Sequence, residues 1–239
     1  MRARVWFFDL DNTLHDATYS SYVGINEGMT SYIVEQLGVT RAEAGALRQR
    51  YWLRYGATLL GLVRHHGVRP GHFLHHAHRL PGLEQRVYGH AHDLDALRRL
   101  ARQGGRRCVL TNAPADYTAR VLGVLGIGPL FDAVLSIEDM RMFGQWRPKP
   151  DARMLTAMAA RLGARPRDCV LVEDTLEHQK SARRIGMRTV WMQRWLRGSG
   201  PGLRRGAGAA KPPQARPMGA GRPAYVDRRI RRLGQLLRR

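Results

Sequence analysis

The sequence has few of the residues that usually reveal a compartment or an anchor. It contains two cysteines, each at the start of a short apolar run, so a disulfide framework is excluded and buried, reduced thiols are expected. No apolar run approaches the roughly 18 residues that a membrane-spanning helix needs. Asp9 and Asp11 would interrupt the apolar core of a signal peptide. We therefore expect a cytoplasmic protein without a membrane partner.

Acidic residues and lysines are also scarce. Arginine supplies 37 of the 40 basic residues, against 19 acids, which gives a net charge of +21. Eleven arginines and one lysine, against one acid, place about half of that charge in 196–239. One interpretation is a nucleic-acid-binding protein that acts through this arginine-rich C-terminus. It is the less favoured one, because Tyr225 is the only aromatic residue of 197–239 that could stack on a base.

Short apolar runs rich in β-forming residues alternate with helical patterns. Strands are predicted at 5–8, 108–111, 133–136, 169–172 and 189–192, and helices at 114–125, 150–162 and 177–185. Unbroken apolar strands separated by helices indicate a parallel sheet that is covered on both faces. Right-handed crossovers then give an α/β fold with a doubly wound, Rossmann-like sheet.

The stretch between the first two strands is too long for a single crossover. Successive helices are predicted there at 20–37, 41–55, 57–66, 70–79 and 93–103. The first four are expected to form a helical cap (20–92), inserted into a core made of 1–19 and 93–196. The stretch 197–223, rich in Gly, Pro and Arg, is typical of a disordered linker. The basic segment 224–239 is expected to form a short strand and helix that dock on the core through Ile230, Leu233 and Leu237.

Polar side chains follow the predicted strands at the point where each strand ends. Asp9 and Asp11 follow the first strand, Thr111 and Asn112 end the second, and Glu173 and Asp174 follow the fourth, while Lys149 precedes the helix at 150–162. Because parallel strands end at one edge of a sheet, these side chains are expected to share a cleft. Carboxylates this close repel each other unless a cation holds them. A hard divalent cation with oxygen ligands, above all Mg²⁺, fits this set.

Four short motifs carry a resemblance to a known family. "DLDNT" from Asp9, "TN" from Thr111, Lys149 and "VEDT" around Asp174 resemble, in order and spacing, the four motifs of the haloacid dehalogenase (HAD) superfamily. The resemblance covers residues 5 to about 192 and implies a hydrolase with the core and inserted cap described above. True dehalogenases lack a second aspartate, so Asp11 points to phosphoryl transfer.

The resemblance also implies a role for each motif residue. Asp9 would be the nucleophile, and Asp11 would protonate the leaving alkoxide and then deprotonate the attacking water. Thr111 would bind the transferring phosphoryl group, Lys149 would neutralise its charge, and Asn112 would contact the substrate. Mg²⁺ would be bound by Asp9, the backbone carbonyl of Asp11 and Asp174, with the adjacent Glu173 bound to it directly or through water.

A finer resemblance lies in the cap. "YGATLLGL" at 55–62, together with "DNTLH" and "VEDT", resembles the pyrimidine 5′-nucleotidase branch of the superfamily. It implies a pyrimidine nucleoside 5′-monophosphate as substrate, with Tyr55 and Thr58 as substrate contacts. The alternatives within the superfamily are a sugar-phosphate phosphatase and a phosphomutase. In such proteins an asparagine often follows "VEDT" at the position that His178 occupies here.

Overall fold

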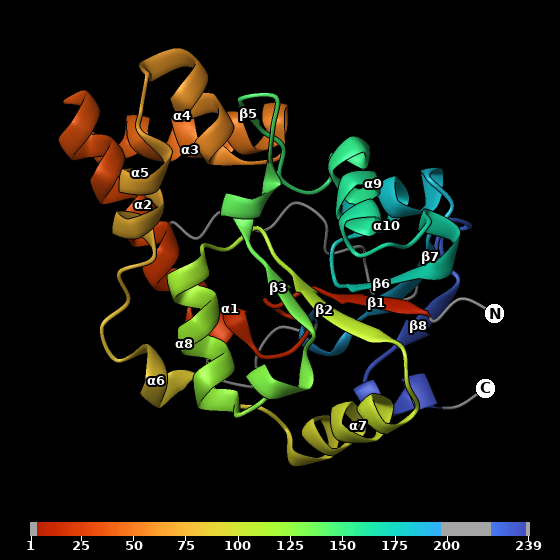
Figure 1. Ribbon diagram of the computed structural model, residues 1–239. Helices are drawn as coiled ribbons and strands as arrows, with labels where there is room; N and C mark the ends of the chain where they lie inside the picture. Colours follow the sequence, from red (N-terminus) through yellow and green to blue (C-terminus); the bar gives the residue numbers. More distant parts are fainter. Residues whose placement is uncertain (1–3, 197–220, 238–239) are drawn as a thin grey trace.

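The computed structural model describes residues 4–196 and 221–237 and contains a parallel sheet of six strands in the order β3-β2-β1-β6-β7-β8 (Figure 1). The strands are β1 (Val5–Phe8), β2 (Arg106–Leu110), β3 (Ala133–Leu135), β6 (Cys169–Glu173), β7 (Arg188–Met192) and β8 (Arg228–Ile230). In the central register, Phe7 of β1 lies between Cys108 of β2 and Leu171 of β6. All five neighbouring pairs are parallel, so the predicted α/β fold is confirmed.

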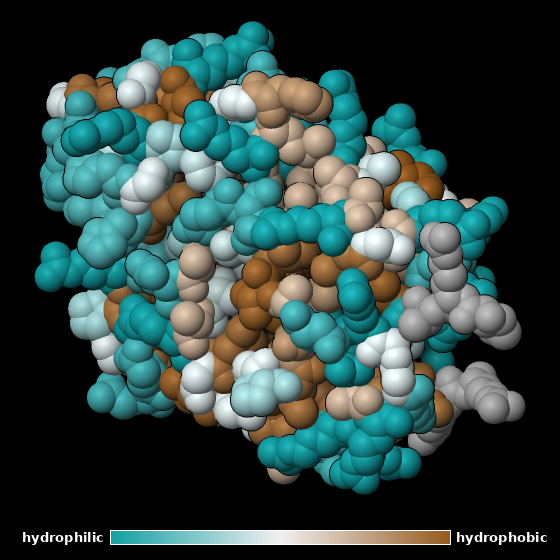
Figure 2. Space-filling view, viewed as in Figure 1, coloured by the Kyte–Doolittle hydropathy of each residue, from teal (hydrophilic) through white to brown (hydrophobic). Residues whose placement is uncertain are grey.

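Alternate residues of β1 face two different hydrophobic layers. Trp6 and Phe8 pack with residues of α7 (Ala91–Arg102) and α8 (Ala115–Leu125), whereas Val5 and Phe7 pack with residues of α9 (Ala152–Arg161) and α10 (Leu176–Arg184). Every residue of β1 is buried, because both faces of the sheet carry helices. The unbroken apolar runs of the sequence follow from this double cover. On the face seen in Figure 2, apolar side chains gather over β2 and the edge strand β3.

The insertion between β1 and β2 is helical, as the sequence predicts. It contains α1 (Ala17–Ser20), α2 (Tyr22–Leu37), α3 (Arg41–Tyr55), α4 (Thr58–His66), α5 (Pro70–Ala77) and α6 (Leu83–Arg86), and the short α6 is not predicted from the sequence. Helices α2 to α5 enclose a hydrophobic cluster of their own (Figure 1). Thr40 begins α3 with a capping box to Glu43. Helix α3 ends at Gly56, whose φ of 79° favours glycine.

A small β-hairpin precedes Lys149 and was not predicted from the sequence. Its strands β4 (Arg141–Met142) and β5 (Gln145–Trp146) are only two residues long, too short to give a pattern. Trp146 of β5 packs with the hydrophobic cluster of the cap, so the hairpin links the cap to the core. Short 3₁₀ helices complete the structure at Gly128–Leu130, Ile137–Met140, Pro166–Asp168, Arg194–Leu196 and Leu233–Leu237.

The C-terminal segment adds strand β8 to the edge of the sheet beside β7. Ile230 and Leu233 are buried in the main core, and the backbone N–H of Leu233 donates to Oδ1 of Asp93 at 2.8 Å. Instead of the predicted helix, the structure has the 3₁₀ helix Leu233–Leu237, which packs on α7. Most of the predicted linker (197–220) lies outside the described residues. Among the described helices, none is both long and apolar enough to cross a membrane.

Candidate active site

The ends of β1, β2 and β6 bring the predicted site residues to one edge of the sheet. Asp9 directly follows β1, and its backbone N–H donates to the carbonyl of Val172 in β6 at 3.0 Å. Glu173 is the last residue of β6, and Asp174 follows it. Asp9, Glu173 and Asp174 can each offer an oxygen within 4.8 Å of the other two. The crossover topology therefore gathers carboxylates that are far apart in the sequence.

Lys149 reaches into this cluster from the loop after the β-hairpin. Its Nζ lies 2.6 Å from Oδ1 of Asp9 and 2.7 Å from Oε2 of Glu173, and the residue is 1% exposed. The loop is fixed by Asn112, whose amide accepts from the backbone N–H of Lys149 at 2.8 Å and donates to its carbonyl at 2.9 Å. Asn112 thus positions Lys149, and its predicted contact with substrate stays a prediction.

The charges of the cluster do not balance. Burial, followed by the charge of Glu173, raises the pKa of Asp9 to about 8, although Lys149 acts in the opposite direction. Burial and the charges of Glu173 and Asp9 raise the pKa of Asp174 well above its ordinary value. Burial opposes ionisation of Glu173 too, but Lys149 and then His178 outweigh it and lower its pKa. A single lysine therefore leaves negative charge uncompensated.

This donor set fits a magnesium ion. Mg²⁺ prefers carboxylate and carbonyl oxygens and supplies the positive charge that the cluster lacks. Glu173 is already occupied, because Oε1 accepts from the backbone N–H of Thr175 at 3.1 Å and Oε2 faces Lys149. Nδ1 of His178 also lies 3.0 Å from Oε2 of Glu173. Asp9 and Asp174 are the side chains that we expect to bind the metal, although the hydroxyls of Thr13 (3.4 Å from Oδ2 of Asp9) and Thr175 (3.2 Å from Oδ1 of Asp174) also contact them.

Asp11 and Thr111 lie near the cluster with partners of their own. Oδ1 of Asp11 lies 2.9 Å from Nε2 of His15 and 2.8 Å from the hydroxyl of Tyr117. Thr111 is 1% exposed, and its hydroxyl oxygen accepts from the backbone N–H of Ala113 at 3.1 Å. This bond leaves the hydroxyl proton of Thr111 able to donate.

The two predicted cap contacts use their hydroxyl groups within the cap. The hydroxyl of Thr58 donates to the carbonyl of Arg48 at 3.2 Å, and that of Tyr55 lies 2.6 Å from Nε2 of His65. Tyr55 also lines a shallow groove with Trp146 and Pro150, on the loop that carries Lys149. Contact of Tyr55 and Thr58 with substrate stays a prediction.

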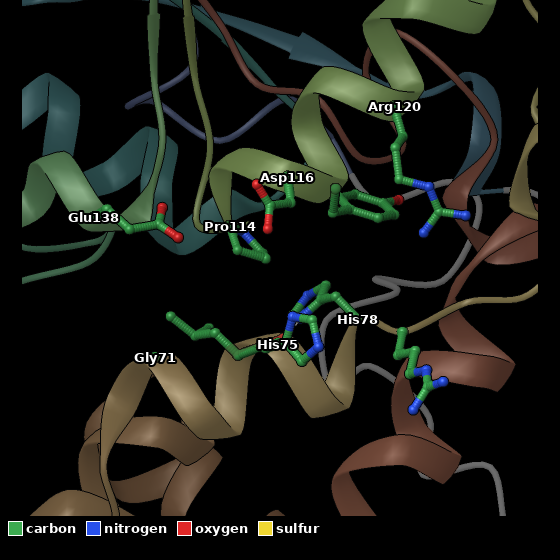
Figure 3. Close-up of a pocket in the computed structure, with 10 residues that line it drawn as sticks. Gly71, His75, His78, Pro114, Asp116, Arg120 and Glu138 are labelled. Carbon is green, nitrogen blue, oxygen red and sulfur yellow. The ribbon is translucent and has the colours of Figure 1, made fainter.

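A cavity of about 280 Å³ between the cap and the core, the cap–core cavity, was not predicted from the sequence (Figure 3). The cap contributes Gly71, Leu74, His75, His78 and Arg79, and the core contributes Pro114, Asp116, Tyr117, Arg120 and Glu138. In Figure 3, His75 and His78 lie across the cavity from Pro114 and Asp116 at the start of α8. Tyr117 connects the cavity to the site, because its ring is part of the lining and its hydroxyl contacts Asp11.

Tyr22 is another side chain that the sequence does not reveal. It is the first residue of α2, and its side chain packs against the main hydrophobic core. Burial and the charges of Asp11, Asp174 and Asp9 raise the pKa of Tyr22 well above its ordinary value, so it is a neutral donor. Neither Tyr22 nor Tyr117 belongs to a motif, although Tyr117 is the single aromatic residue of α8.

Comparisons with known proteins agree with this geometry. The family model of haloacid dehalogenase-like hydrolases matches residues 3–186. Phosphoglycolate phosphatase 1 of Pseudomonas aeruginosa is 24% identical over 199 residues, which are 77% of this chain and 67% of that protein. A phosphoglycolate phosphatase of Pectobacterium atrosepticum is 26% identical over 199 residues, covering 77% and 78% of the two chains.

Solved structures show the same fold. A HAD phosphatase from Thermococcus onnurineus matches with a TM-score of 0.61 and 19% identity, over 98% of this chain and 95% of that one. A HAD hydrolase of Bacillus subtilis, solved bound to magnesium, matches with a TM-score of 0.58 and 17% identity, over 99% and 97% of the two chains. The predicted superfamily is confirmed, whereas the curated relatives described above are named phosphoglycolate phosphatases rather than nucleotidases. Because the family model spans most of the chain, the protein belongs to the haloacid dehalogenase-like hydrolases.

Proposed function

We propose that the protein is a Mg²⁺-dependent phosphomonoesterase that forms an aspartyl-phosphate on Asp9. A carboxylate oxygen of Asp9 attacks phosphorus, the bond to the leaving oxygen breaks, and Asp11 gives that oxygen a proton. Asp11 then takes a proton from the water that attacks the aspartyl-phosphate, which releases inorganic phosphate and restores Asp9. In this proposal the two aspartates have separate roles because they have separate surroundings.

The groups around Asp9 would neutralise and hold the phosphoryl group. Lys149 supplies a fixed positive charge 2.6 Å from the nucleophile, and Thr111 supplies a hydroxyl donor. Glu173 keeps Lys149 in place from the other side, at 2.7 Å. Asp9, Asp174 and the carbonyl of Asp11 would hold Mg²⁺, which supplies further positive charge opposite the phosphoryl oxygens when it is bound.

One observation carries this proposal. Oδ1 of Asp9 is paired with Lys149, an oxygen of Asp174 lies within 4.8 Å of one of Asp9, and Asp11 contacts Tyr117 and His15 outside this cluster. Phosphoryl transfer needs little more than such positioning and charge neutralisation. A structural ion pair would need neither the additional carboxylate Asp174 nor Asp11.

For the substrate we propose a small phosphate ester with a further anionic or polar group, such as 2-phosphoglycolate. The names of the curated relatives support it. The cap–core cavity supports it too, because about 280 Å³ lies below the ~300–1,000 Å³ of pockets for larger ligands. Its cap side offers Arg79, whose guanidinium suits an anion, while Asp116 and Glu138 line the core side. The nucleoside monophosphate rests on the resemblance of residues 55–62, whose key hydroxyls have partners within the cap.

The test is hydrolysis of 2-phosphoglycolate, UMP and p-nitrophenyl phosphate, with Mg²⁺ and with EDTA. We expect Mg²⁺-dependent release of phosphate by the wild type and none by Asp9→Asn. A higher kcat/KM for 2-phosphoglycolate than for UMP supports the small substrate. A higher kcat/KM for UMP than for 2-phosphoglycolate, together with a lower kcat/KM for UMP alone in Tyr55→Ala, would instead support a nucleotidase. Phosphate release by Asp9→Asn at the wild-type rate would refute the covalent mechanism.

A further inference from the structure

The carboxyl group of Asp11 belongs to a closed ring of hydrogen-bonding contacts between side chains. Its Oδ1 contacts the Tyr117 hydroxyl at 2.8 Å, which contacts the Ser21 hydroxyl at 2.8 Å. The Ser21 hydroxyl lies 2.9 Å from that of Ser20, which lies 3.3 Å from Nδ1 of His15. Nε2 of His15 closes the ring at 2.9 Å from Oδ1 of Asp11. Each member therefore has a partner on both sides.

The ring is buried except at Asp11. His15 and Tyr117 are at most 1% exposed, and Ser20 and Ser21 at most 3%, whereas the side chain of Asp11 is 18% exposed. Burying four polar side chains costs free energy unless each finds a partner, and the ring supplies those partners. Among the described residues, both partners of Asp11 contact Oδ1, and Oδ2 makes no hydrogen bond. The carboxyl group is thus held by one oxygen, with the other left for a reacting group.

Two parts of the chain build this ring. His15, Ser20 and Ser21 lie on the segment that leads from Asp11 into the cap, and Tyr117 lies on α8 of the core. The hydroxyl of Tyr117 has one proton, so when it donates to Asp11 it accepts from Ser21. The ring therefore fixes both the torsion of the Asp11 side chain and the place of the segment that carries it.

We propose that Tyr117 and His15 are positioning residues for Asp11, which orient its carboxyl group to protonate the leaving oxygen. The inference rests on the proposed phosphatase function. A rotation of this carboxyl group would leave the charge of the site unchanged and misplace only the proton. Loss of the ring should therefore harm substrates that need a proton on the leaving oxygen, and spare those that do not.

The decisive variant is Tyr117→Phe. It removes the hydroxyl group from the hydrogen-bond network and keeps the aromatic ring that packs against His78. The readout is kcat/KM for two classes of ester, because this constant reports the step in which the leaving group departs. Alkyl phosphates (2-phosphoglycolate, glycerol phosphate and UMP) release an alkoxide that needs a proton, whereas p-nitrophenyl phosphate releases a stable anion. We expect about a 10- to 100-fold loss for the best alkyl ester, part of the ~10²–10⁴ that a general acid supplies. For p-nitrophenyl phosphate we expect a loss of less than about 3-fold.

Three further variants separate positioning from stability. Tyr32→Phe is the matched control: it removes a phenol hydroxyl that contacts an imidazole nitrogen, Nδ1 of His72 at 3.1 Å, inside the cap, and should leave the ratio between the two ester classes unchanged. Ser21→Ala opens the same ring at the next contact and should shift the ratio in the same direction but less. In an Asp11→Asn background, Tyr117→Phe should cause no further loss for the alkyl ester, because it acts through Asp11.

Each remaining outcome overturns a particular statement. Equal losses of kcat/KM for both ester classes in Tyr117→Phe, or an additive loss in the double variant, would show that the ring only stabilises the structure and does not position Asp11. If Tyr117→Phe does not fold, Ser21→Ala takes its place. An unchanged ratio of kcat/KM between the two ester classes in Ser21→Ala would then show that the ring is only structural. A wild type that hydrolyses only the aryl ester would show that Asp11 supplies no proton, and would overturn this inference while the phosphatase function stands. A wild type that hydrolyses neither ester would refute the proposed function and this inference together.

Discussion

Replacing Lys149 with methionine tests whether the carboxylate cluster is short of positive charge. Methionine keeps most of the volume of the side chain and removes the ammonium group, which lies 2.6 Å from Asp9 and 2.7 Å from Glu173. Breaking a buried ion pair by removing one partner costs about 3–5 kcal/mol, because the other partner stays buried without compensation. At about 2–4 °C per kcal/mol for a chain of this size, the expected fall in Tm is roughly 6–20 °C in EDTA.

Magnesium should restore part of this loss. In Lys149→Met a bound Mg²⁺ would be the only cation near Asp9 and Asp174, so it should bind more tightly than in the wild type. A ligand present at about 100 times its Kd stabilises the folded state by about 2.7 kcal/mol. We therefore expect MgCl₂ to raise the Tm of Lys149→Met by more than that of the wild type. The assay is thermal unfolding followed by circular dichroism, with excess EDTA or with MgCl₂.

The matched control is Lys180→Met, on the exposed surface of α10. It removes the same charge from the only other lysine that the structure describes and should change the stability by less than about 0.5 kcal/mol. Lys149→Met should also lose activity on every phosphate ester alike, because it acts on the phosphoryl group. A Tm within the range of Lys180→Met, together with an equal response to Mg²⁺ in all three proteins, would refute the argument from charge.

Three other predictions follow from single contacts. Asp11→Asn should lower kcat for alkyl phosphates about 10²- to 10⁴-fold and leave the Mg²⁺-induced rise in Tm intact, since only its backbone carbonyl is expected to bind the metal; parallel losses would contradict this role. Ile230→Asp should destabilise the protein by roughly 3 kcal/mol or more in urea unfolding, because Ile230 is 1% exposed in β8. The control variant Arg229→Asp, at the exposed neighbouring position of β8, should not destabilise it to this extent. Burial lowers the pKa of His78, so the unfolded chain takes up its proton first, and stability should fall below about pH 6.5. His78→Gln should flatten that dependence, and identical slopes in urea unfolding against pH would contradict it.

The sheet could be predicted from the sequence because its central strands β1 and β6 are buried on both faces. The five predicted strands match β1, β2, β3, β6 and β7, whose apolar runs are continuous and separated by helices with clear beginnings and ends. The β-hairpin at Arg141–Trp146 and helix α6 were not predicted, because each is too short to show a hydrophobic periodicity. The C-terminal helix was misjudged in type: Leu233 and Leu237 fit an α-helical spacing, whereas the 3₁₀ helix buries Leu233 and Leu236, three residues apart.

The carboxylate cluster could be predicted for a topological reason. Parallel strands with crossovers all end at one edge, so Asp9, Thr111 and Glu173 meet without any knowledge of side-chain angles. The division of work between Glu173 and Asp174 could not be predicted, because neighbouring residues point in different directions. Only the structure shows that Glu173 faces Lys149 and the N–H of Thr175, so we expect Asp174 rather than Glu173 to bind the metal.

The residues that reach the site from helices could not be predicted from the sequence, for a different reason. A shift of one residue turns a helical side chain by about 100°, so the packing angle of a helix decides which residue faces the site. Tyr117 is a buried core residue by its pattern in α8, and nothing in that pattern shows its hydroxyl 2.8 Å from Asp11. His15 lies in the loop between β1 and α1 rather than on a helix, and nothing in its motif shows that it is 0% exposed and contacts Asp11. In the proposed mechanism, strand ends therefore determine where the phosphoryl group is bound, whereas the packing of α8 determines how the proton donor is oriented, and only the first can be predicted without coordinates.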